Sequence, residues 1–168
     1  MPKMKHNMTF VVLLIASVAQ ADGLRSPEGD VVLTVSGNIT HTNGDGVARF
    51  DRAMLQDLQQ ATITAATPWF DATHDFSGPL GLAVLEAVGA QGGTLRVVAL
   101  NDYAATVPAA DLRDLGAVLA THLDGQMMSV RDKGPLFLIY PFDDNPDLFD
   151  EVYFGRSVWQ IARIEVQD

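Results

Sequence analysis

An uninterrupted apolar and aromatic run in the C-terminal third constrains the fold most. It extends from Leu136 to Tyr140, with Gly134-Pro135 before it and Pro141 after it. A run of this length between chain breakers is typical of a strand that is buried on both faces, because it is too short for a helix. The sequence therefore predicts a core strand here. The charged groups at its two ends, Arg131 to Lys133 and Asp143 to Asn145, are expected in loops, where binding sites usually form.

The N-terminus has the pattern of a secretory signal. Lys3 and Lys5 precede a short apolar run from Phe10 to Val18, and Ala19-Gln20-Ala21 is a small-x-small cleavage pattern. The apolar run is shorter than the about 20 residues that a membrane span needs. We therefore expect a cleaved signal over residues 1–21, a single domain over residues 22–168, a periplasmic location and no direct membrane insertion after cleavage.

Charge and composition exclude several kinds of partner and chemistry. The net charge is −10, and removal of the predicted signal takes away two lysines and no acid. Such a chain repels phosphate backbones, so a nucleic acid partner is not expected. The chain also has no cysteine. Without disulfides an exported domain depends on its hydrophobic core, and neither a thiolate metal ligand nor a cysteine nucleophile can be present.

Hydrophobic periodicity and turn residues predict many strands and a few short helices. Asp51 is the expected N-cap of the first helix. This order of elements predicts an α+β fold with a mixed sheet. Strands are expected at 31–35, 61–65, 95–100, 118–123, 127–130, 136–140 and 157–166, and helices at 51–58, 77–88 and 109–115, while the acidic and aromatic segment 147–155 has no assigned element.

Several short motifs occur in an order that resembles a known domain family. These motifs are Ser77-Gly78-Pro79-Leu80, Leu95 to Tyr103, Gly134-Pro135-Leu136, Val158-Trp159-Gln160-Ile161 and Ile164-Glu165-Val166. From about residue 31 onward, the chain resembles the molybdopterin-binding domain of the sulfite oxidase type. The resemblance implies the molybdopterin-binding fold of that type, α+β with a mixed sheet and a few short helices.

The chain departs from the molybdenum enzymes of that family in its chemistry. In those enzymes a cysteine ligates the metal, whereas the matching region here is Ala65-Ala66-Thr67-Pro68-Trp69. An alanine methyl group has no lone pair with which to bind a metal. Molybdenum is therefore not expected, and neither metal-ligating nor catalytic residues are assigned. His41, His74 and His122 have no paired spacing that would suggest another metal site.

A closer resemblance is to small exported members of this fold that bind a free pterin and act with membrane-bound cyclic-di-GMP enzymes. It rests on the runs Val130 to Leu136 and Gly155 to Gln160. This resemblance implies a metal-free pterin as ligand and the periplasmic part of a membrane signalling protein as partner. The alternative interpretation is a molybdopterin-dependent oxidoreductase, or a subunit that holds the cofactor of one.

Candidate pterin-binding residues follow from what a pterin needs, which is an aromatic face and a polar group that pairs with its amino-pyrimidine edge. Trp69 is either a stacking platform or a half-buried core residue, and Asp102 either pairs with the ligand or belongs to a turn. Arg131 and Lys133 are either donors to a ligand oxygen or phosphate, or solvated charges. The full candidate set is Trp69, Asn101, Asp102, Tyr103, Arg131, Lys133, Tyr153, Arg156 and Ser157.

Two further segments are assigned other roles. Trp159 alternates with Val158 in the closing segment, and we expect Trp159 to be primarily structural. The acidic loop Asp143-Asp144-Asn145 is expected to face outward toward the partner, because an acidic cluster between prolines is a weak calcium signal.

Overall fold

The computed structural model describes residues 23–168, which form three sheets and several short helices. The predicted signal over residues 1–21 lies outside the described residues. Within residues 23–168, no helix is both long and apolar enough to cross a membrane.

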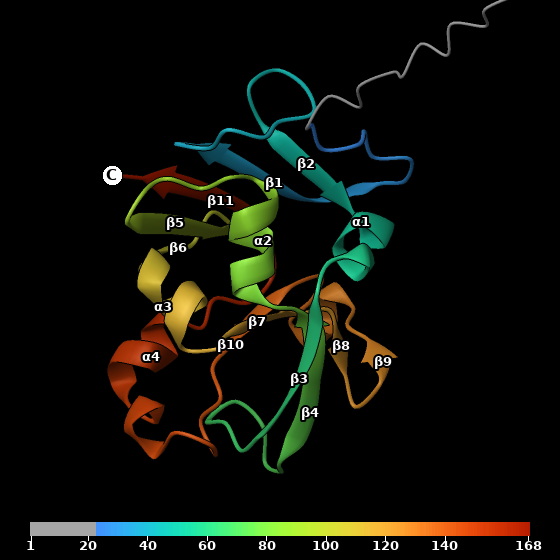
Figure 1. The fold of residues 1–168 in the computed structure, drawn as a ribbon. Helices are drawn as coiled ribbons and strands as arrows, with labels where there is room; N and C mark the ends of the chain where they lie inside the picture. The colour runs from blue at the N-terminus through green and yellow to red at the C-terminus, as the bar shows by residue number, and fades with distance from the viewer. Residues whose placement is uncertain (1–22) are drawn as a thin grey trace, which may run out of the picture.

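A five-stranded sheet forms one layer of the molecule, at the top of Figure 1, with the order β2-β1-β11-β5-β6. β1 and β11 are parallel and the other neighbours are antiparallel, so the sheet is mixed as predicted. Its strands are β1 (Val31–Gly37), β2 (Ala48–Asp51), β5 (Thr94–Ala99), β6 (Ala104–Pro108) and β11 (Ile161–Gln167).

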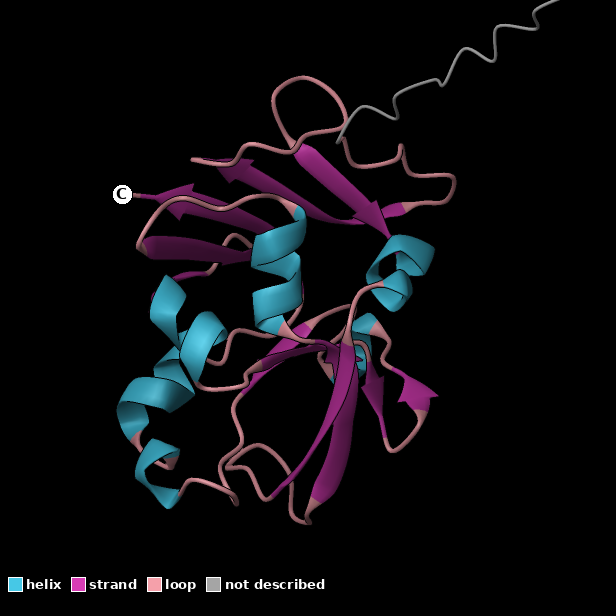
Figure 2. Cartoon of the chain, viewed as in Figure 1, coloured by secondary structure: helices cyan, strands magenta, loops and turns pink. Residues whose placement is uncertain are grey.

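The lower part of the molecule contains two smaller sheets (Figure 2). One has the order β3-β4-β8-β9, made of β3 (Gln60–Ala65), β4 (His74–Pro79), β8 (His122–Leu123) and β9 (Gln126–Met127). The other pairs β7 (Val118–Ala120) with β10 (Phe137–Ile139). The helices are α1 (Arg52–Asp57), α2 (Gly81–Ala87), α3 (Ala109–Asp114) and α4 (Glu151–Arg156), with 3-10 turns at Val130–Asp132 and Pro146–Leu148.

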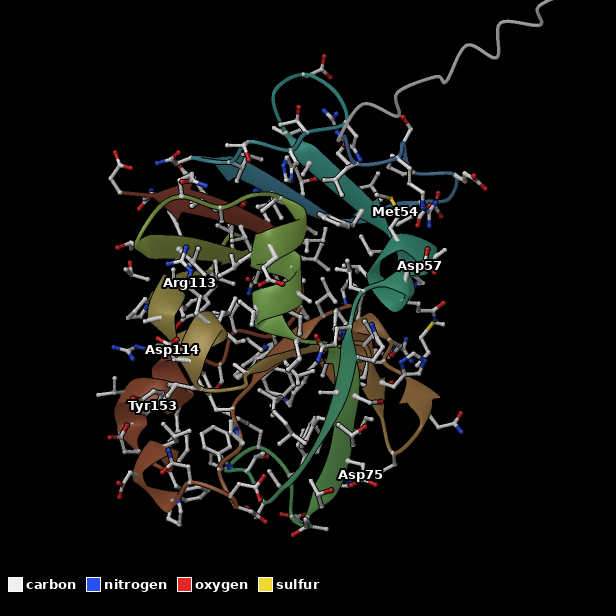
Figure 3. The ribbon with its side chains drawn as sticks, viewed as in Figure 1. Met54, Asp57, Asp75, Arg113, Asp114 and Tyr153 are labelled. Carbon is white, nitrogen blue, oxygen red and sulfur yellow. The ribbon has the colours of Figure 1, made fainter. Side chains whose placement is uncertain are left out.

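The predicted core strand is confirmed at the centre of the fold. Every residue from Leu136 to Tyr140 is fully buried, and β10 pairs antiparallel with β7, which is also buried throughout. Side chains fill the space between the upper sheet and the lower strands (Figure 3). One hydrophobic core therefore holds all three sheets, as expected for a chain without disulfides.

The first helix begins where the sequence predicts. The Asp51 carboxylate accepts a hydrogen bond from the backbone N–H of Met54 at 2.8 Å, which is the N-cap interaction. It also accepts backbone hydrogen bonds from Glu28 at 2.7 Å and Gly29 at 2.9 Å. Asp51 therefore fastens the segment before β1 to the start of α1.

The second helix begins later than predicted, because Ser77-Gly78-Pro79 belongs to β4. This strand pairs with β3 along its whole length and with β8 at Phe76 and Ser77. A Cβ atom on Gly78 would collide with the backbone carbonyl of Leu119, so glycine allows β4 to lie directly against β7. The Gly-Pro pair was wrongly interpreted as a helix start, because this cross-strand approach is a tertiary feature.

Other boundaries also differ from the prediction. β6 was missed because its alanine-rich sequence has weak strand propensity, and pairing with β5 determines it. The segment 147–155 contains most of α4, whose N-cap Asp150 accepts hydrogen bonds from the backbone N–H groups of Val152 and Tyr153. The predicted strand at 127–130 ends at Met127, and the closing strand begins at Ile161, so Ser157 to Gln160 form a connecting segment.

Replacing Asp51 with alanine should lower the free energy of unfolding at neutral pH. The hydrogen bond from the Gly29 N–H, followed by that from Met54, lowers the pKa of Asp51 from 3.8 to about 2. A carboxyl whose pKa is lower in the folded state stabilises the protein above its unfolded pKa and loses this effect as pH falls. The difference in unfolding free energy between parent and Asp51→Ala should therefore shrink between pH 3.8 and about 2 in denaturant titrations. A difference that stays constant across that range would contradict the assignment of these hydrogen bonds to Asp51. Asp144→Ala, at an exposed position, is the control.

Candidate ligand-binding site

A cavity of about 440 Å³ opens where segments far apart in the sequence meet. The loop after β3 supplies Trp69, the end of β5 and the following turn supply three residues, and α4 with the segment after it supplies the rest. The lining residues are Trp69, Ala99, Asn101, Tyr103, Glu151, Phe154, Gly155, Ser157, Val158 and Trp159.

The wall of this cavity is mainly aromatic. The ring centroid of Trp69 lies 5.9 Å from that of Trp159 and 5.8 Å from that of Phe154, and both contacts are edge-to-face. On its core side, Trp69 packs edge-to-face on the buried Phe137 at 5.3 Å. The two roles considered for Trp69 are therefore compatible, because the same ring packs on the core and lines the cavity.

Lys133 lies against the aromatic wall without lining the cavity. Its Nζ is 4.8 Å from the ring centroid of Trp159 and 5.4 Å from that of Phe70, which is cation–π geometry. The backbone carbonyl of Lys133 also accepts a hydrogen bond from the Gln160 N–H at 2.9 Å. Lys133 thus helps to position Trp159.

A buried polar network attaches α4 to the core. The Asp111 carboxylate on α3 accepts hydrogen bonds from the Tyr140 hydroxyl at 2.9 Å and from Arg156 of α4 at 3.0 Å. Burial, reinforced by the adjacent carboxylate, raises the pKa of Tyr140, so this hydroxyl remains a proton donor. Arg156 also lies over the ring of Tyr153, which packs against Tyr140. Figure 3 labels Tyr153 on α4.

The turn between β5 and β6 forms another edge of the cavity. Asp102 has a φ of 65°, and the Asn101 side-chain oxygen accepts a hydrogen bond from the Tyr103 N–H at 3.1 Å. These features belong to a tight turn. The Asp102 carboxylate pairs with Arg163 of β11 at 2.8 Å, whereas Asn101 and Tyr103 line the cavity.

The structure brings four of the nine candidate residues together and places five elsewhere. Trp69, Asn101, Tyr103 and Ser157 line the cavity. The Ser157 hydroxyl donates to the Tyr153 carbonyl at 2.9 Å, so it closes the end of α4. The candidates outside the lining are Asp102, Arg131, Lys133, Tyr153 and Arg156. Four of these make the side-chain contacts described above. The fifth, Arg131, is exposed in a 3-10 turn.

Sequence reasoning did not include several lining residues. Glu151 and Gly155 lie on α4, which was not predicted, although Asp150 as an N-cap before Glu151 was the available signal. Trp159 was expected to be primarily structural, but it is 39% exposed and lines the cavity. It does so because the chain before β11 is not a strand, so strand alternation does not apply there.

The acidic loop predicted to face a partner is partly anchored. The Asp143 carboxylate accepts a hydrogen bond from the backbone N–H of Ala66 at 3.0 Å, beside the end of β3. Asp144 and Asn145 are exposed. The predicted interaction with a partner remains a prediction.

The donor groups present do not fit a metal-bearing, phosphate-bearing molybdopterin. The chain has no cysteine, and residues 23–168 contain no group of three His, Asp or Glu side chains placed to hold a metal ion. No Lys or Arg lines the described cavity to pair with a phosphate. The aromatic wall and the polar groups on it instead suit a flat heterocycle.

Comparisons with known proteins support the fold. No protein-family model matches the sequence, and no curated protein matches it. Among solved structures, the sulfane dehydrogenase SoxCD from Paracoccus pantotrophus is similar, with a TM-score of 0.59 and 15% sequence identity. The match covers 81% of this chain and 38% of that chain. At this identity it shows the fold alone, and it confirms the predicted α+β fold of the sulfite oxidase type.

Replacing Asp111 with alanine should destabilise the protein by about 2–3 kcal/mol, because Arg156 and the Tyr140 hydroxyl would lose their shared acceptor. Tyr140→Phe removes only one hydrogen bond and should cost about 1 kcal/mol. Chemical denaturation of the two variants measures both values. An equal loss of unfolding free energy in the two variants would mean that the Asp111–Arg156 pair adds nothing to the attachment of α4.

Proposed function

We propose that this chain is a periplasmic, non-enzymatic pterin-binding protein, and that the cavity between Trp69, Trp159 and α4 holds the ligand. The observation that carries this proposal is the lining itself. Aromatic rings from three segments form its wall, and amide, hydroxyl and carboxylate groups lie on the same surface. A pterin is flat and polar at its edge, so stacking and edge hydrogen bonds would both be satisfied there.

The proposed role is to report ligand occupancy to the periplasmic part of a membrane-bound cyclic-di-GMP-metabolising protein. The resemblance of Val130 to Leu136 and Gly155 to Gln160 to exported pterin-binding proteins supports this role. Gly155 and Trp159 from the second run line the cavity, so ligand binding would directly affect a segment that carries the resemblance.

The second candidate function is a molybdopterin-dependent oxidoreductase, or a cofactor-holding subunit of one. The observation in its favour is the fold match to a sulfane dehydrogenase. The donor groups oppose it, because the region that resembles the family's metal-ligating segment, Ala65 to Trp69, contains no cysteine. One fold supports many functions, so the groups at the site weigh more than the fold.

The ligand carried by the purified mature protein distinguishes the two functions. Absorbance and fluorescence spectra should show a pterin, and elemental analysis should find no stoichiometric molybdenum. Protein purified without ligand should bind added pterin in calorimetric titrations. Stoichiometric molybdenum would overturn the proposed function in favour of the second.

Replacing Trp159 with leucine should weaken pterin binding roughly three- to tenfold, which corresponds to the loss of one aromatic stacking contact. Trp159 is partly exposed, so the variant should still fold, as circular dichroism would verify. Asp102→Asn is the control, because Asp102 pairs with Arg163 outside the cavity lining and its variant should retain the parent affinity. If pterin binding weakens in Asp102→Asn but not in Trp159→Leu, the ligand lies over the β5–β6 turn instead.

A further inference from the structure

Among residues 23–168, one acidic side chain and no basic one line the cavity. Glu151, the first residue of α4, is exposed and lines the cavity, and the other lining residues are aromatic, aliphatic, glycine or neutral polar. In a partly enclosed space with apolar walls, a single carboxylate determines the sign of the local potential. The lining itself therefore carries a net negative charge, which comes from Glu151.

The basic residues near the cavity lie outside its lining and interact with other groups. Arg156 is paired with the buried Asp111, and Arg163 is paired with Asp102. The ammonium group of Lys133 lies against the rings of Trp159 and Phe70. A phosphate in the cavity would therefore have no cation among the lining residues with which to pair.

Backbone amides at the start of α4 do not provide an alternative anion site. The Asp150 carboxylate accepts hydrogen bonds from the N–H groups of Val152 at 2.8 Å and Tyr153 at 3.2 Å. These donors are already occupied, and Asp150 adds a second negative charge beside Glu151. An anionic ligand would meet repulsion from two adjacent carboxylates.

We infer that Glu151 determines the specificity of the cavity, which selects a planar heterocycle that has an amidine-like or guanidine-like edge and carries no phosphate. This inference rests on the proposed pterin site. The 2-amino-4-oxo pyrimidine edge of a pterin presents adjacent N–H donors, which a carboxylate accepts in a paired arrangement. The same carboxylate repels a phosphorylated side chain, so it favours one feature of the ligand and excludes the other.

Two matched ligand pairs test each half of the inference by calorimetric titration. Pterin and lumazine differ at the 2-position, where lumazine has an oxo group in place of the amino group. 7,8-Dihydroneopterin and its triphosphate differ only in the phosphate groups. The parent protein should bind pterin about tenfold more tightly than lumazine, as expected for a hydrogen bond to a charged acceptor. It should bind dihydroneopterin at least tenfold more tightly than the triphosphate.

Glu151→Gln should reduce both ratios to within about threefold of unity, because an amide has no charge and can donate to the lumazine oxygen. Asp147→Asn is the matched control, since it removes one exposed carboxylate outside the cavity lining, and both ratios should remain at the parent values. Circular dichroism would show that both variants fold.

The outcomes separate this inference from the proposed function. If the parent protein binds none of the four compounds, the proposed pterin-binding function fails. If it binds pterin and Glu151→Gln leaves both ratios unchanged, the pterin site stands and the assignment of Glu151 is overturned. Equal changes in Glu151→Gln and Asp147→Asn would attribute the selectivity to overall charge and would also overturn it.

Discussion

The candidate site depends most on the hydrogen bonds that the Asp111 carboxylate accepts. It lies on α3 and accepts hydrogen bonds from Tyr140, at the end of the buried core strand, and from Arg156 on α4. A buried charge is tolerated only when it is paired and hydrogen-bonded, and both conditions hold here. The network attaches a six-residue helix, too short to be stable alone, to the buried core of the molecule. Because α4 supplies Glu151 and Phe154, this attachment also maintains one wall of the cavity.

An aromatic cluster connects the same core to the cavity lining. Trp69 packs on Phe137 of β10 and also contacts Phe154 and Trp159. Aromatic side chains from distant segments of the chain therefore form one packed cluster. Lys133 covers Trp159. Edge-to-face contacts of this kind fix ring orientation as well as excluding water. The cavity is thus an extension of the hydrophobic core that opens to solvent, and substitutions there are expected to affect both packing and ligand affinity.

Charge, rather than fold, distinguishes this site from one for a metal cofactor. The fold is the one seen in the similar sulfane dehydrogenase, but this chain has no thiolate and no basic residue in the described cavity lining. The basic residues nearby take part in structural interactions, with Arg156 anchoring α4 and Arg163 holding the β5–β6 turn. The lining favours a flat ligand that donates hydrogen bonds over one that carries phosphate.

The sequence alone determined the features that depend on local pattern. The buried strand around Phe137, the N-cap at Asp51 and the α+β class follow from periodicity and capping, which act between near neighbours. The absence of cysteine likewise excluded thiolate chemistry from the sequence alone. Tertiary structure decided which candidates meet: Trp69, Asn101, Tyr103 and Ser157 converge, while Arg156 turns to Asp111. It also placed Glu151 and Trp159 in the cavity, because long-range pairing and packing set those positions and no short-range pattern encodes them.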